Sequence, residues 1–299
     1  MVDVDVLAEA ERNRAVAAAL FKAGLSPAAF AIDWGRAMAD GRERVRALLA
    51  SSSNLHNLAE ALAADASHLT ALRFLMAPPM SQDRFALVEP RYRKQENSGG
   101  PLSSETARAL ADRFEEWADS SRVAALRSDD NVSHRLAVEV TASLIAAQSV
   151  QTLSRTRLAG GQEVAIEERL LSRGWVKESA RTIDGLARLP PRSFMRKTKM
   201  ITADGTVQEV DIACGLKGGR ILAMECKVSN DQTNSIKRVN DVVKKAGAWQ
   251  KHWGNFVATA AMLQGVFAKN EPIRLLQANI LVFWSHDLDG FISWLEEAA

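Results

Sequence analysis

The chain has 299 residues, of which 47% are hydrophobic and 25% are charged. This balance is typical of a soluble globular protein with one large domain or two ordinary ones, and it excludes a largely disordered chain. No run of apolar residues approaches the ~18 that a membrane helix needs, and the acidic N-terminal segment is unlike a secretory signal. The two cysteines, Cys214 and Cys226, suffice for neither a disulfide framework nor a good zinc site. We therefore expect a cytoplasmic protein.

The formal net charge of +2 conceals an asymmetry between the two halves of the chain. Residues 1–150 hold 17 basic and 20 acidic side chains, whereas residues 151–299 hold 21 and 16. A basic second half suits an anionic partner such as DNA. An excess of this size also arises by chance, so charge alone leaves the partner open.

Helical spacing of apolar residues dominates the first half of the chain. Four alanine-rich segments within residues 6–77 have this spacing, and Pro78 and Pro79 end the run because proline cannot continue a helix. Residues 91–104 are polar and carry glycine, serine and proline, which predicts a loop or linker. Another helix is predicted to start at Ser103, whose hydroxyl suits an N-cap.

The second half changes from helix to a mixture of helices and strands. A long helix is predicted from about residue 131 to Gly160-Gly161, with a shorter one after it. Further helices are expected after the second and the third strand. The segments with strand character are 207–216, 220–228 and 278–284. We therefore expect an α/β (α+β) fold, with a helical region over residues 1–135 and a core over residues 136–299, whose mixed central sheet is flanked by helices.

Charged side chains stand in the first two strand-like segments. Asp211 lies in one, and Glu225 and Lys227 lie in the other among apolar neighbours. Burying a carboxylate and an ammonium is costly unless they pair or bind a metal. Glu225 and Lys227 are two residues apart, so on a strand they face the same way. The pattern predicts a carboxylate and a lysine side by side on one face of a sheet.

The loop between these strands decides where Asp211 points. A two-residue turn at Gly218-Gly219 would turn Asp211 away from Glu225. An odd-length loop or a bulge would place Asp211, Glu225 and Lys227 on one face. We therefore predict an odd loop or a bulge in this hairpin.

Two converging carboxylates suit a hard divalent cation, most naturally Mg²⁺. A neighbouring lysine can position a water that attacks a phosphodiester and help to deprotonate it, and Lys227 also lowers the cost of crowding the acids. The alternative is a structural Glu–Lys pair, since the spacing alone is a weak pattern. Glu163, on the helix ahead of the strands, is the favoured further acid, and Glu167 one turn later stays open. Both also fit a solvated helix start, where the dipole favours carboxylates.

Groups that bind phosphates or base edges follow the second strand. Asn and Arg suit adenine and guanine edges, whereas Ser and Lys more often hold phosphates. Several of them share one helix face at three- and four-residue steps, as the wet face of an ordinary amphipathic helix also would. The candidates for DNA contact here are Ser229, Asn230, Asn234, Ser235, Lys237 and Arg238.

The segment PPRSFMRKTKM supplies four cations with no acid between them. We interpret it as a basic loop that either follows a DNA backbone or is simply solvated. Its candidates for DNA contact are Arg196, Lys197 and Lys199. His286, beside two aspartates at the end of a strand, is expected to be structural.

The segment ECKVSNDQTNSIKRVND, with EVDIACGL before it and ANILVFWSHDLDGFISWL after it, resembles the XamI type of restriction endonuclease in the PD-(D/E)XK nuclease superfamily. The resemblance covers most of residues 140–299 and is fainter in LRFLMAPPMSQDRF. Asp211, Glu225 and Lys227 match the family's catalytic positions, and Glu163 matches its helix acid. Val210 stands where the superfamily name has proline, which is often absent there.

The resemblance implies a Mg²⁺-dependent type II enzyme that cuts both strands of DNA and has a companion DNA methyltransferase. The family is associated with the palindrome GTCGAC. We expect a homodimer on double-stranded DNA, in which residues 1–135 supply dimer contacts, arms around the duplex, or both. The alternatives are a repair or anti-phage nuclease with little sequence preference and a non-catalytic DNA-binding module. No membrane partner is expected.

Overall fold

The computed structural model describes residues 4–185 and 189–299. The chain divides into two compact units: a helical unit, Ser26–Ser154, and a sheet unit that combines Arg155–Ala299 with the N-terminal residues up to Leu25. These bounds differ from the expected division between residues 135 and 136. One continuous helix runs through that point, and the first helix of the chain contacts the central sheet.

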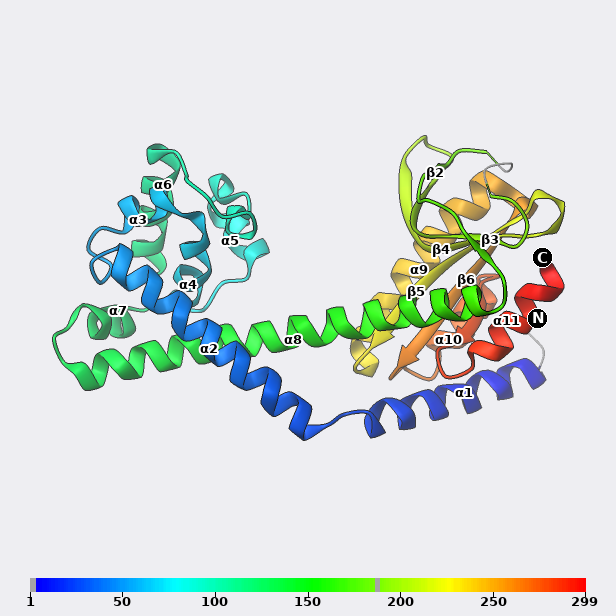
Figure 1. The fold of residues 1–299 in the computed structure, drawn as a ribbon, viewed down its shortest axis with the longest axis horizontal. Helices are drawn as coiled ribbons and strands as arrows, with labels where there is room; N and C mark the ends of the chain where they lie inside the picture. The colour runs from blue at the N-terminus through cyan, green and yellow to red at the C-terminus, as the bar shows by residue number, and fades with distance from the viewer. Residues whose placement is uncertain (1–3, 186–188) are drawn as a thin grey trace. The chain divides into compact units, whose positions relative to one another are not determined.

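Short and medium helices surround one apolar core in the helical unit (Figure 1). Leu62, Leu72 and Phe114 are fully buried there. The predicted N-cap is confirmed, because the Ser103 hydroxyl accepts a hydrogen bond from the backbone N–H of Thr106. The helices are α2 Pro27–Ser51, α3 Leu58–Ala64, α4 Leu69–Phe74, α5 Gln82–Val88, α6 Ser104–Trp117, α7 Ser120–Arg127 and the first part of α8 Asn131–Ser172.

The polar stretch 91–104 is not a linker between the units. It lies inside the helical unit and includes the 3₁₀ turn Gln95–Asn97. Glu96 in that turn is 3% exposed and pairs at 2.6 Å with Arg73, which is 2% exposed. The buried ion pair holds the stretch against α4, although most of its other polar residues are exposed to solvent.

The helix α8 is continuous through Gly160-Gly161, where the sequence predicted a break. Each glycine costs about 1 kcal/mol relative to alanine within a helix, which tertiary contacts easily offset. Ile166 and Leu170 provide such contacts, because both are buried in the core of the sheet unit. The two predicted helices are therefore one.

By length and composition alone, α8 also passes a test for membrane-spanning helices. An 18-residue window within it has a mean hydropathy of 1.2, and 33% of that window is buried in the protein. The sequence has no unbroken apolar run of this length, because this helix alternates alanine, valine and leucine with small polar residues. Core helices of soluble proteins pass the same test, so composition does not make α8 a membrane helix.

The described part of the sheet unit contains one seven-stranded mixed sheet in the order β1-β3-β4-β5-β6-β7, with β2 also paired to β3. The pairs β3–β4 and β4–β5 are antiparallel, and the pairs β5–β6 and β6–β7 are parallel. The strands are β1 Val176–Lys177, β2 Thr182–Ile183, β3 Ser193–Ile201, β4 Val207–Gly215, β5 Ile221–Ser229, β6 Val257–Gly265 and β7 Leu281–Trp284. The helices are α1 Val4–Ala23, α9 Gln232–Trp253, α10 Glu271–Gln277, α11 Leu288–Ala298 and the second part of α8.

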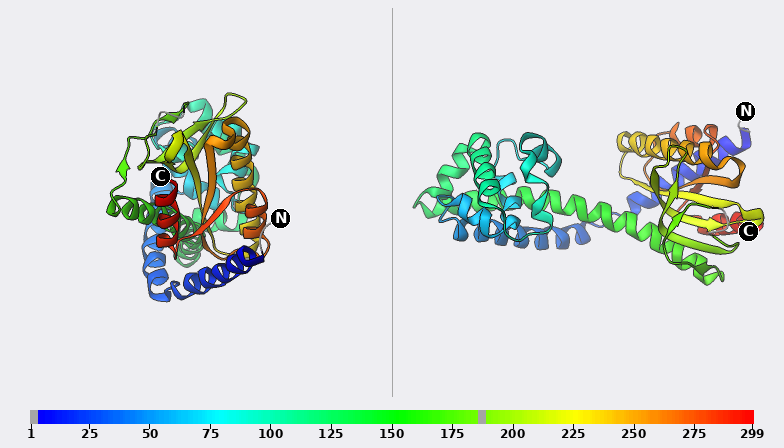
Figure 2. Two further views of the ribbon diagram at one scale, coloured as in Figure 1. Left: turned by 90° about the vertical axis from the view of Figure 1, so that its right-hand side faces the viewer. Right: turned by 90° about the horizontal axis from the view of Figure 1, so that it is seen from above.

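Helices cover both faces of this sheet, as the end-on view in Figure 2 shows. Met224 and Met262 point to one face, where α8 and α11 pack on them. Ala261 and Leu263 point to the other face, toward α1, α9 and α10. The predicted α/β class, with a mixed central sheet flanked by helices, is confirmed.

Two long strands were not predicted. The segment PPRSFMRKTKM, interpreted as a basic loop, contains most of β3, whose buried Met195, Thr198 and Met200 anchor it in the sheet. Two of its cations, Arg196 and Lys197, pair with acids of the same unit. The basic composition of the segment is therefore compatible with a strand and does not indicate a solvated loop. The strand β6 lies between two parallel neighbours and is buried on both faces, so it lacks the alternation that marks a half-exposed strand.

Candidate active site

The hairpin of β4 and β5 has the odd loop that the chemistry required. Five residues, Leu216 to Arg220, connect the strands, and pairing runs from Gly215 with Ile221 to Ile212 with Met224. Gly218 and Gly219 adopt positive φ angles of 67° and 71°, which glycine tolerates without a steric penalty. This register places Asp211 opposite Glu225, so the predicted common face is confirmed.

The ladder between β4 and β5 stops just before the acids. Beyond the pair of Ile212 with Met224, Asp211 Oδ2 accepts the backbone N–H of Cys226 at 2.8 Å. A side-chain carboxylate thus replaces a backbone carbonyl at the point where the strands separate. The other carboxylate oxygen of Asp211, Oδ1, faces a lysine ammonium at 2.7 Å.

Glu225 is fully buried and is held by two lysines. Lys227 Nζ lies 2.6 Å from Glu225 Oε2 and 3.9 Å from Asp211 Oδ2. Lys245, on α9, donates to both carboxylate oxygens of Glu225 at 2.8 and 2.9 Å and to the carbonyl of Glu209 at 2.9 Å. The predicted acid–lysine pair is therefore present, and Lys245 is a further member that sequence reasoning missed.

A third lysine joins the helix acid to the strand acid. Lys197 Nζ lies 2.6 Å from Glu163 Oε1 and 2.7 Å from Asp211 Oδ1. Glu163 is buried on α8, and its carboxylate meets the sheet at this bridge. Lys197 was a candidate for DNA contact in the sequence, but the structure places it inside the acid cluster.

Glu167, the alternative helix acid, lies in a neighbouring charge pair. It is bonded to Lys177 and at 2.8 Å to Arg196 Nη1, and Arg196 also approaches Glu163 at 3.6 Å. Of the two helix acids, only Glu163 shares an ammonium with Asp211. The geometry therefore supports Glu163 as the acid next to the strand cluster.

The lysines set the electrostatics of the acids. Burial alone would raise the pKa of Asp211, but the hydrogen bond from Lys197 and the charge of Lys227 bring that pKa below its ordinary value. Burial would lower the pKa of Lys197, and its bonds to Asp211 and Glu163 instead raise it. Burial and the neighbouring Asp211 raise the pKa of the Cys226 thiol, so it stays protonated and is a poor metal ligand.

The oxygen donors of the cluster suit a hard cation, although lysine ammonium groups neutralise the charge of the carboxylates in this structure. Asp211, Glu225 and Glu163 offer only carboxylate oxygens, the donors that Mg²⁺ prefers. No group of three or more His, Cys, Asp or Glu side chains is arranged around a single cation position in residues 4–185 and 189–299. A divalent cation would instead be held by two carboxylates with water. The Lys197 ammonium, between two of the acids, marks a position where positive charge is already stabilised.

Most candidates for DNA contact after β5 meet in one polar pocket. A cavity of about 170 Å³ is lined by Val228, Ser229, Asn230, Asn234, Lys237 and Arg238. Asn234, Lys237 and Arg238 are exposed on α9, so they can reach a ligand outside the protein. The predicted shared helix face is present.

The two serines in this segment serve the chain itself. Ser229 is buried, and its hydroxyl donates to the carbonyl of Asp231 at 2.7 Å. Ser235 is buried too, and its hydroxyl accepts the N–H of Ala268 at 3.0 Å. Their positions give no support to direct DNA contacts. Lys199 remains exposed on β3, opposite Glu209 of β4.

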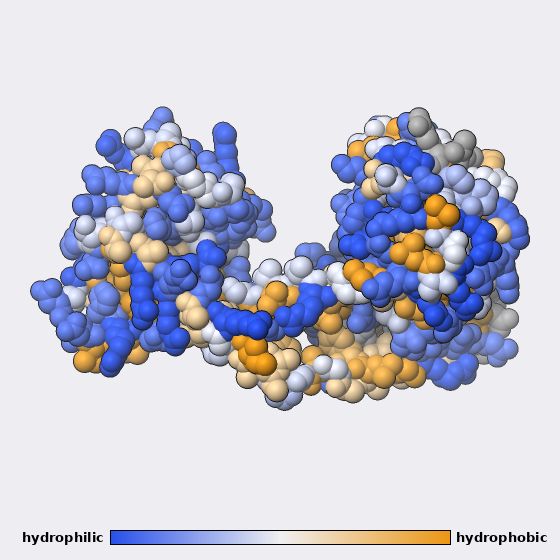
Figure 3. Space-filling view, viewed as in Figure 1, coloured by the Kyte–Doolittle hydropathy of each residue, from blue (hydrophilic) through white to orange (hydrophobic). Residues whose placement is uncertain are grey.

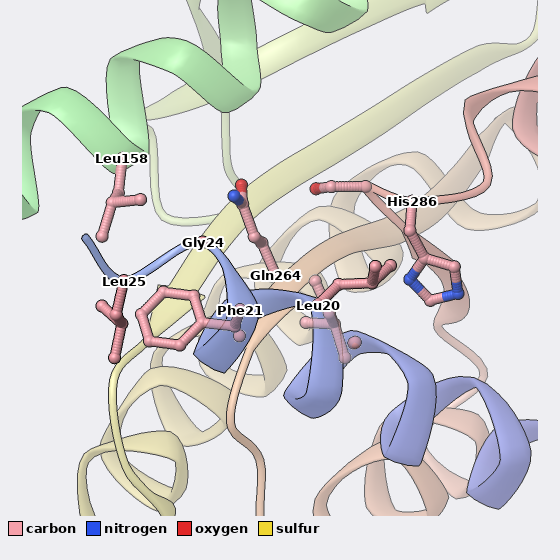
Figure 4. Close-up of a pocket in the computed structure, with 11 residues that line it drawn as sticks. Leu20, Phe21, Gly24, Leu25, Leu158, Gln264 and His286 are labelled. Atoms are coloured by element: carbon pink, nitrogen blue, oxygen red, sulfur yellow. The ribbon is translucent and has the colours of Figure 1, made fainter.

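A separate apolar cavity of about 240 Å³ lies between α1, α8 and the ends of β6 and β7 (Figure 4). Leu20, Phe21 and Leu158 line it, and none of the acids or lysines of the cluster does. His286 at its rim lies 3.2 Å from Asn13 of α1, which agrees with a structural role. The cavity is therefore not the place of the charged chemistry.

Comparison with known proteins identifies the group to which this geometry belongs. The model of the family described as XamI restriction endonuclease matches residues 53–284. The chain belongs to the XamI restriction endonuclease family. It is therefore an enzyme of a DNA-cleaving family, as the motifs around Glu225 and Lys227 implied.

Two known proteins illustrate the range of similarity. The type II restriction enzyme XamI from Xanthomonas campestris pv. amaranthicola is 27% identical over 262 residues, which cover 83% of this chain and 91% of that protein. Among solved structures, protein VC1899 from Vibrio cholerae aligns with 91% of this chain at 10% identity and a TM-score of 0.30. The chain spans only 57% of the length of VC1899, and so low a score says nothing about a shared site.

Proposed function

We propose that this protein is a type II restriction endonuclease that uses Mg²⁺ to hydrolyse phosphodiester bonds in double-stranded DNA at a short palindromic site. One observation carries the proposal: Asp211, Glu225 and Lys227 lie together where β4 and β5 separate, with Lys227 2.6 Å from Glu225. Family membership and the 27% identity to a type II enzyme over most of both chains support it.

In this proposal Asp211 and Glu225 hold the cation together with water, and Glu163 on α8 is a further acid beside them. Mg²⁺, when bound, supplies positive charge that stabilises the negative charge growing on the phosphate. The depth of the site matters, because Glu225 is fully buried and Asp211 nearly so. Low exposure strengthens each electrostatic contact relative to bulk water.

Lys227 orients the reactants in this scheme. Its ammonium lies beside both strand acids, within a largely buried site. From there its N–H groups can hold the attacking water and a non-bridging phosphate oxygen. Lys245 approaches Glu225 from α9 and fixes the direction of that carboxylate. We assign Lys227 to the reaction and Lys245 to positioning.

The polar pocket beside the acids is the proposed place of DNA contact. Asn230, Asn234 and Arg238 have side chains suited to base edges, and Lys237 suits phosphates. Lys199, on β3 and outside this pocket, suits phosphates as well. The pocket begins directly after Lys227 on β5, so contact there brings a phosphate toward the acids. Arg196 is paired with Glu167 and Glu163, so we assign it to these acids and not to DNA contact.

A palindromic site implies two copies of the chain, because one acid cluster cuts one strand at a time. Val132, Leu136 and Val140 on α8 are 65%, 63% and 40% exposed, and their spacing of four residues puts them on one helix face. An exposed apolar stripe of this kind often marks a protein contact. We propose it as the homodimer contact of the helical unit.

The proposed setting is a restriction–modification system, in which a companion methyltransferase protects the same site in the host DNA. The palindrome GTCGAC, associated with the family, is the first sequence to examine. The residues of this chain do not by themselves specify a recognition sequence.

Digestion of phage DNA with the purified protein and Mg²⁺, followed by sequencing of the ends, tests the proposal. Discrete fragments with one common end sequence are expected. A smear would favour an unspecific repair or anti-phage nuclease, and intact DNA that is nevertheless bound would favour a non-catalytic binding module.

Active-site variants locate the chemistry. Asp211→Asn and Glu225→Gln should abolish cutting while DNA binding persists, and Lys227→Ala should lose roughly two to four orders of magnitude in rate. Asp204→Asn, a carboxylate in the turn between β3 and β4, is the matched control and should cut normally. Wild-type rates in the Asp211 or Glu225 variant would refute the assigned site.

A further inference from the structure

Lys197 occupies an unusual place among the charges of the site. Its ammonium bridges Glu163 and Asp211 at 2.6 and 2.7 Å, while Glu209 Oε1 lies 3.6 Å away. Three carboxylates from α8 and β4 thus surround one lysine from β3. Asp211 Oδ2 is already bonded to the Cys226 N–H, so Lys197 sits on the other oxygen, the one more open to a cation.

The backbone of β3 has an unusual conformation at Lys197. Lys197 has a φ of +53°, although Arg196 and Thr198 on either side keep their pairing with Ile212 and Val210 of β4. A non-glycine residue in the left-handed region costs roughly 1–2 kcal/mol and persists where its surroundings require it. The register on either side places Lys197 opposite Asp211, and the ion pairs of the ammonium provide a compensating gain for the positive φ.

A divalent cation and this ammonium compete for the same oxygens. Two like charges about 4 Å apart repel strongly in a partly buried site. A cation held by Asp211 therefore requires the Lys197 ammonium to leave. The Lys197 side chain is 45% exposed and that of Glu209 is 55% exposed, so the ammonium can turn toward Glu209 and solvent without crossing the core.

We propose that Lys197 is an internal counterion that a divalent cation displaces from Asp211 and Glu163, and that it weakens cation binding by the DNA-free protein. The inference rests on the proposed metal site at Asp211 and Glu225. It makes Lys197 a positioning residue that keeps buried acids compensated before the cation arrives. The enzyme therefore holds its acids together without metal and exchanges one positive charge for another on activation.

Titration of the DNA-free protein with Mn²⁺, followed by the electron paramagnetic resonance signal of the free ion, tests the proposal. Mn²⁺ serves as the probe because carboxylates and water bind it as they bind Mg²⁺. Lys197→Met should bind Mn²⁺ roughly tenfold more tightly than the wild type, a coupling of ordinary size. Lys197→Gly is the second variant, since glycine accepts the positive φ and relieves the backbone strain.

Lys199→Met is the matched control, because it removes one positive charge two residues away on the same strand. Its Mn²⁺ affinity should stay within about twofold of the wild type, since local charge and not net charge decides the effect. If both Lys197 variants bind Mn²⁺ no more tightly than the wild type, and this binding still depends on Asp211, the inference is overturned while the proposed metal site stands. Binding that Asp211→Asn leaves intact in every background would instead refute the proposed metal site and the inference together.

The wild-type chain offers a test that needs no variant. Acylation of lysines, read by mass spectrometry, reports whether an ammonium is held by carboxylates. Saturating Mn²⁺ should raise the acylation rate at Lys197 several-fold and leave that at Lys199 unchanged. Equal rates at Lys197 with and without bound Mn²⁺ would contradict displacement.

Discussion

At the scale of single residues, the members of the acid cluster that the sequence did not predict are lysines and not acids. Glu225 and Lys227 follow from two-residue alternation on a strand, a local rule that needs no tertiary information. Asp211 joins them only through the odd loop of the hairpin, which was predicted from the chemistry of the site. Lys245 follows from no local rule, because only the rotation of α9 decides that it meets Glu225 while Lys244 faces solvent. Lys197 required the pairing of β3 with β4 and a positive φ, neither of which its neighbours in sequence specify.

Residues that read bases and residues that hold phosphates should respond differently to substitution. Asn234→Ala and Arg238→Ala are expected to relax sequence preference by about 1–3 kcal/mol each, because both side chains lie in the polar pocket, the Asn234 amide with a donor and an acceptor and the Arg238 guanidinium with paired donors. Lys199→Ala, on an exposed strand position, should weaken binding to all duplexes alike and flatten the salt dependence. Competition binding between palindromic and random duplexes at several salt concentrations measures both effects. If all three changes weaken binding to every duplex equally, the residues that contact base edges lie in another part of the chain.

At the scale of elements, close contact between strand ends fixes the edge of the sheet that carries the site. Gly265 ends β6 with a φ of +99°, and a Cβ built there would lie 2.2 Å from the carbonyl oxygen of Ser229 at the end of β5. The next residue, Val266, donates its N–H to that same carbonyl at 2.7 Å. The ends of β5 and β6 therefore meet closely only because residue 265 has no side chain.

Gly265→Ala should lower the free energy of unfolding by about 3 kcal/mol or more, because it adds both a backbone clash and left-handed strain. Gly247→Ala is the matched control in the interior of α9, where a new Cβ meets nothing within 4 Å. It should stabilise the protein by up to about 1 kcal/mol through higher helix propensity. Urea unfolding of both variants measures the difference, and equal stabilities would show that the strand ends separate without cost.

The type of an element was predictable where its apolar residues followed one clear period, helical or alternating. The residues at which elements begin and end were not predictable. The helices α6, α9 and α11 and the strands β4, β5 and β7 follow the apolar pattern of their own residues. Two glycines suggested a break in α8, yet buried contacts at Ile166 and Leu170 hold the helix together across them. β6 was missed because burial on both faces removes alternation, leaving composition alone to distinguish it from a helix.

At the scale of the whole molecule, a buried ion pair makes the helical unit sensitive to acid. Burial would raise the pKa of Glu96, but the hydrogen bond and charge of Arg73 bring it below the ordinary value of about 4.3. A carboxyl with a depressed folded pKa stabilises the protein above its unfolded pKa, and this stabilisation is lost as pH falls through the folded pKa. The helical unit should therefore lose stability below about pH 4.

Glu96→Gln should lower stability by about 3–5 kcal/mol at pH 7, because it leaves the Arg73 guanidinium buried and uncompensated. The difference in stability between variant and wild type should narrow as pH falls below about 4. Thermal unfolding between pH 7 and pH 3 measures it, with the exposed Asp112→Asn as control. A gap that stays constant over this range would mean that the Glu96 carboxylate contributes no pH-dependent stability.

The largest scale is the assembly on DNA, which the apolar stripe of α8 allows one to test. Val132, Leu136 and Val140 project from α8 while Ala137 and Val138 on its other side are buried in the helical unit. Figure 3 shows further hydrophobic residues on the surfaces of α1 and α2. The α8 stripe keeps a four-residue spacing over three residues, whereas the exposed pairs Val16–Leu20 on α1 and Phe30–Trp34 on α2 keep it over two. The longer stripe suits a helix-to-helix contact between two copies.

Leu136→Glu should convert a complex of two protomers per short palindromic duplex into one of a single protomer, because a charge in the centre of the stripe is costly to desolvate. Leu87→Glu makes the same chemical change at an exposed leucine outside the stripe and should leave the stoichiometry at two. Sedimentation of each protein with the duplex measures the ratio, and the accompanying digest shows whether the single protomer nicks one strand where the pair breaks both. One wild-type protomer per duplex, with both strands still cut in a single event, would rule out the symmetric dimer.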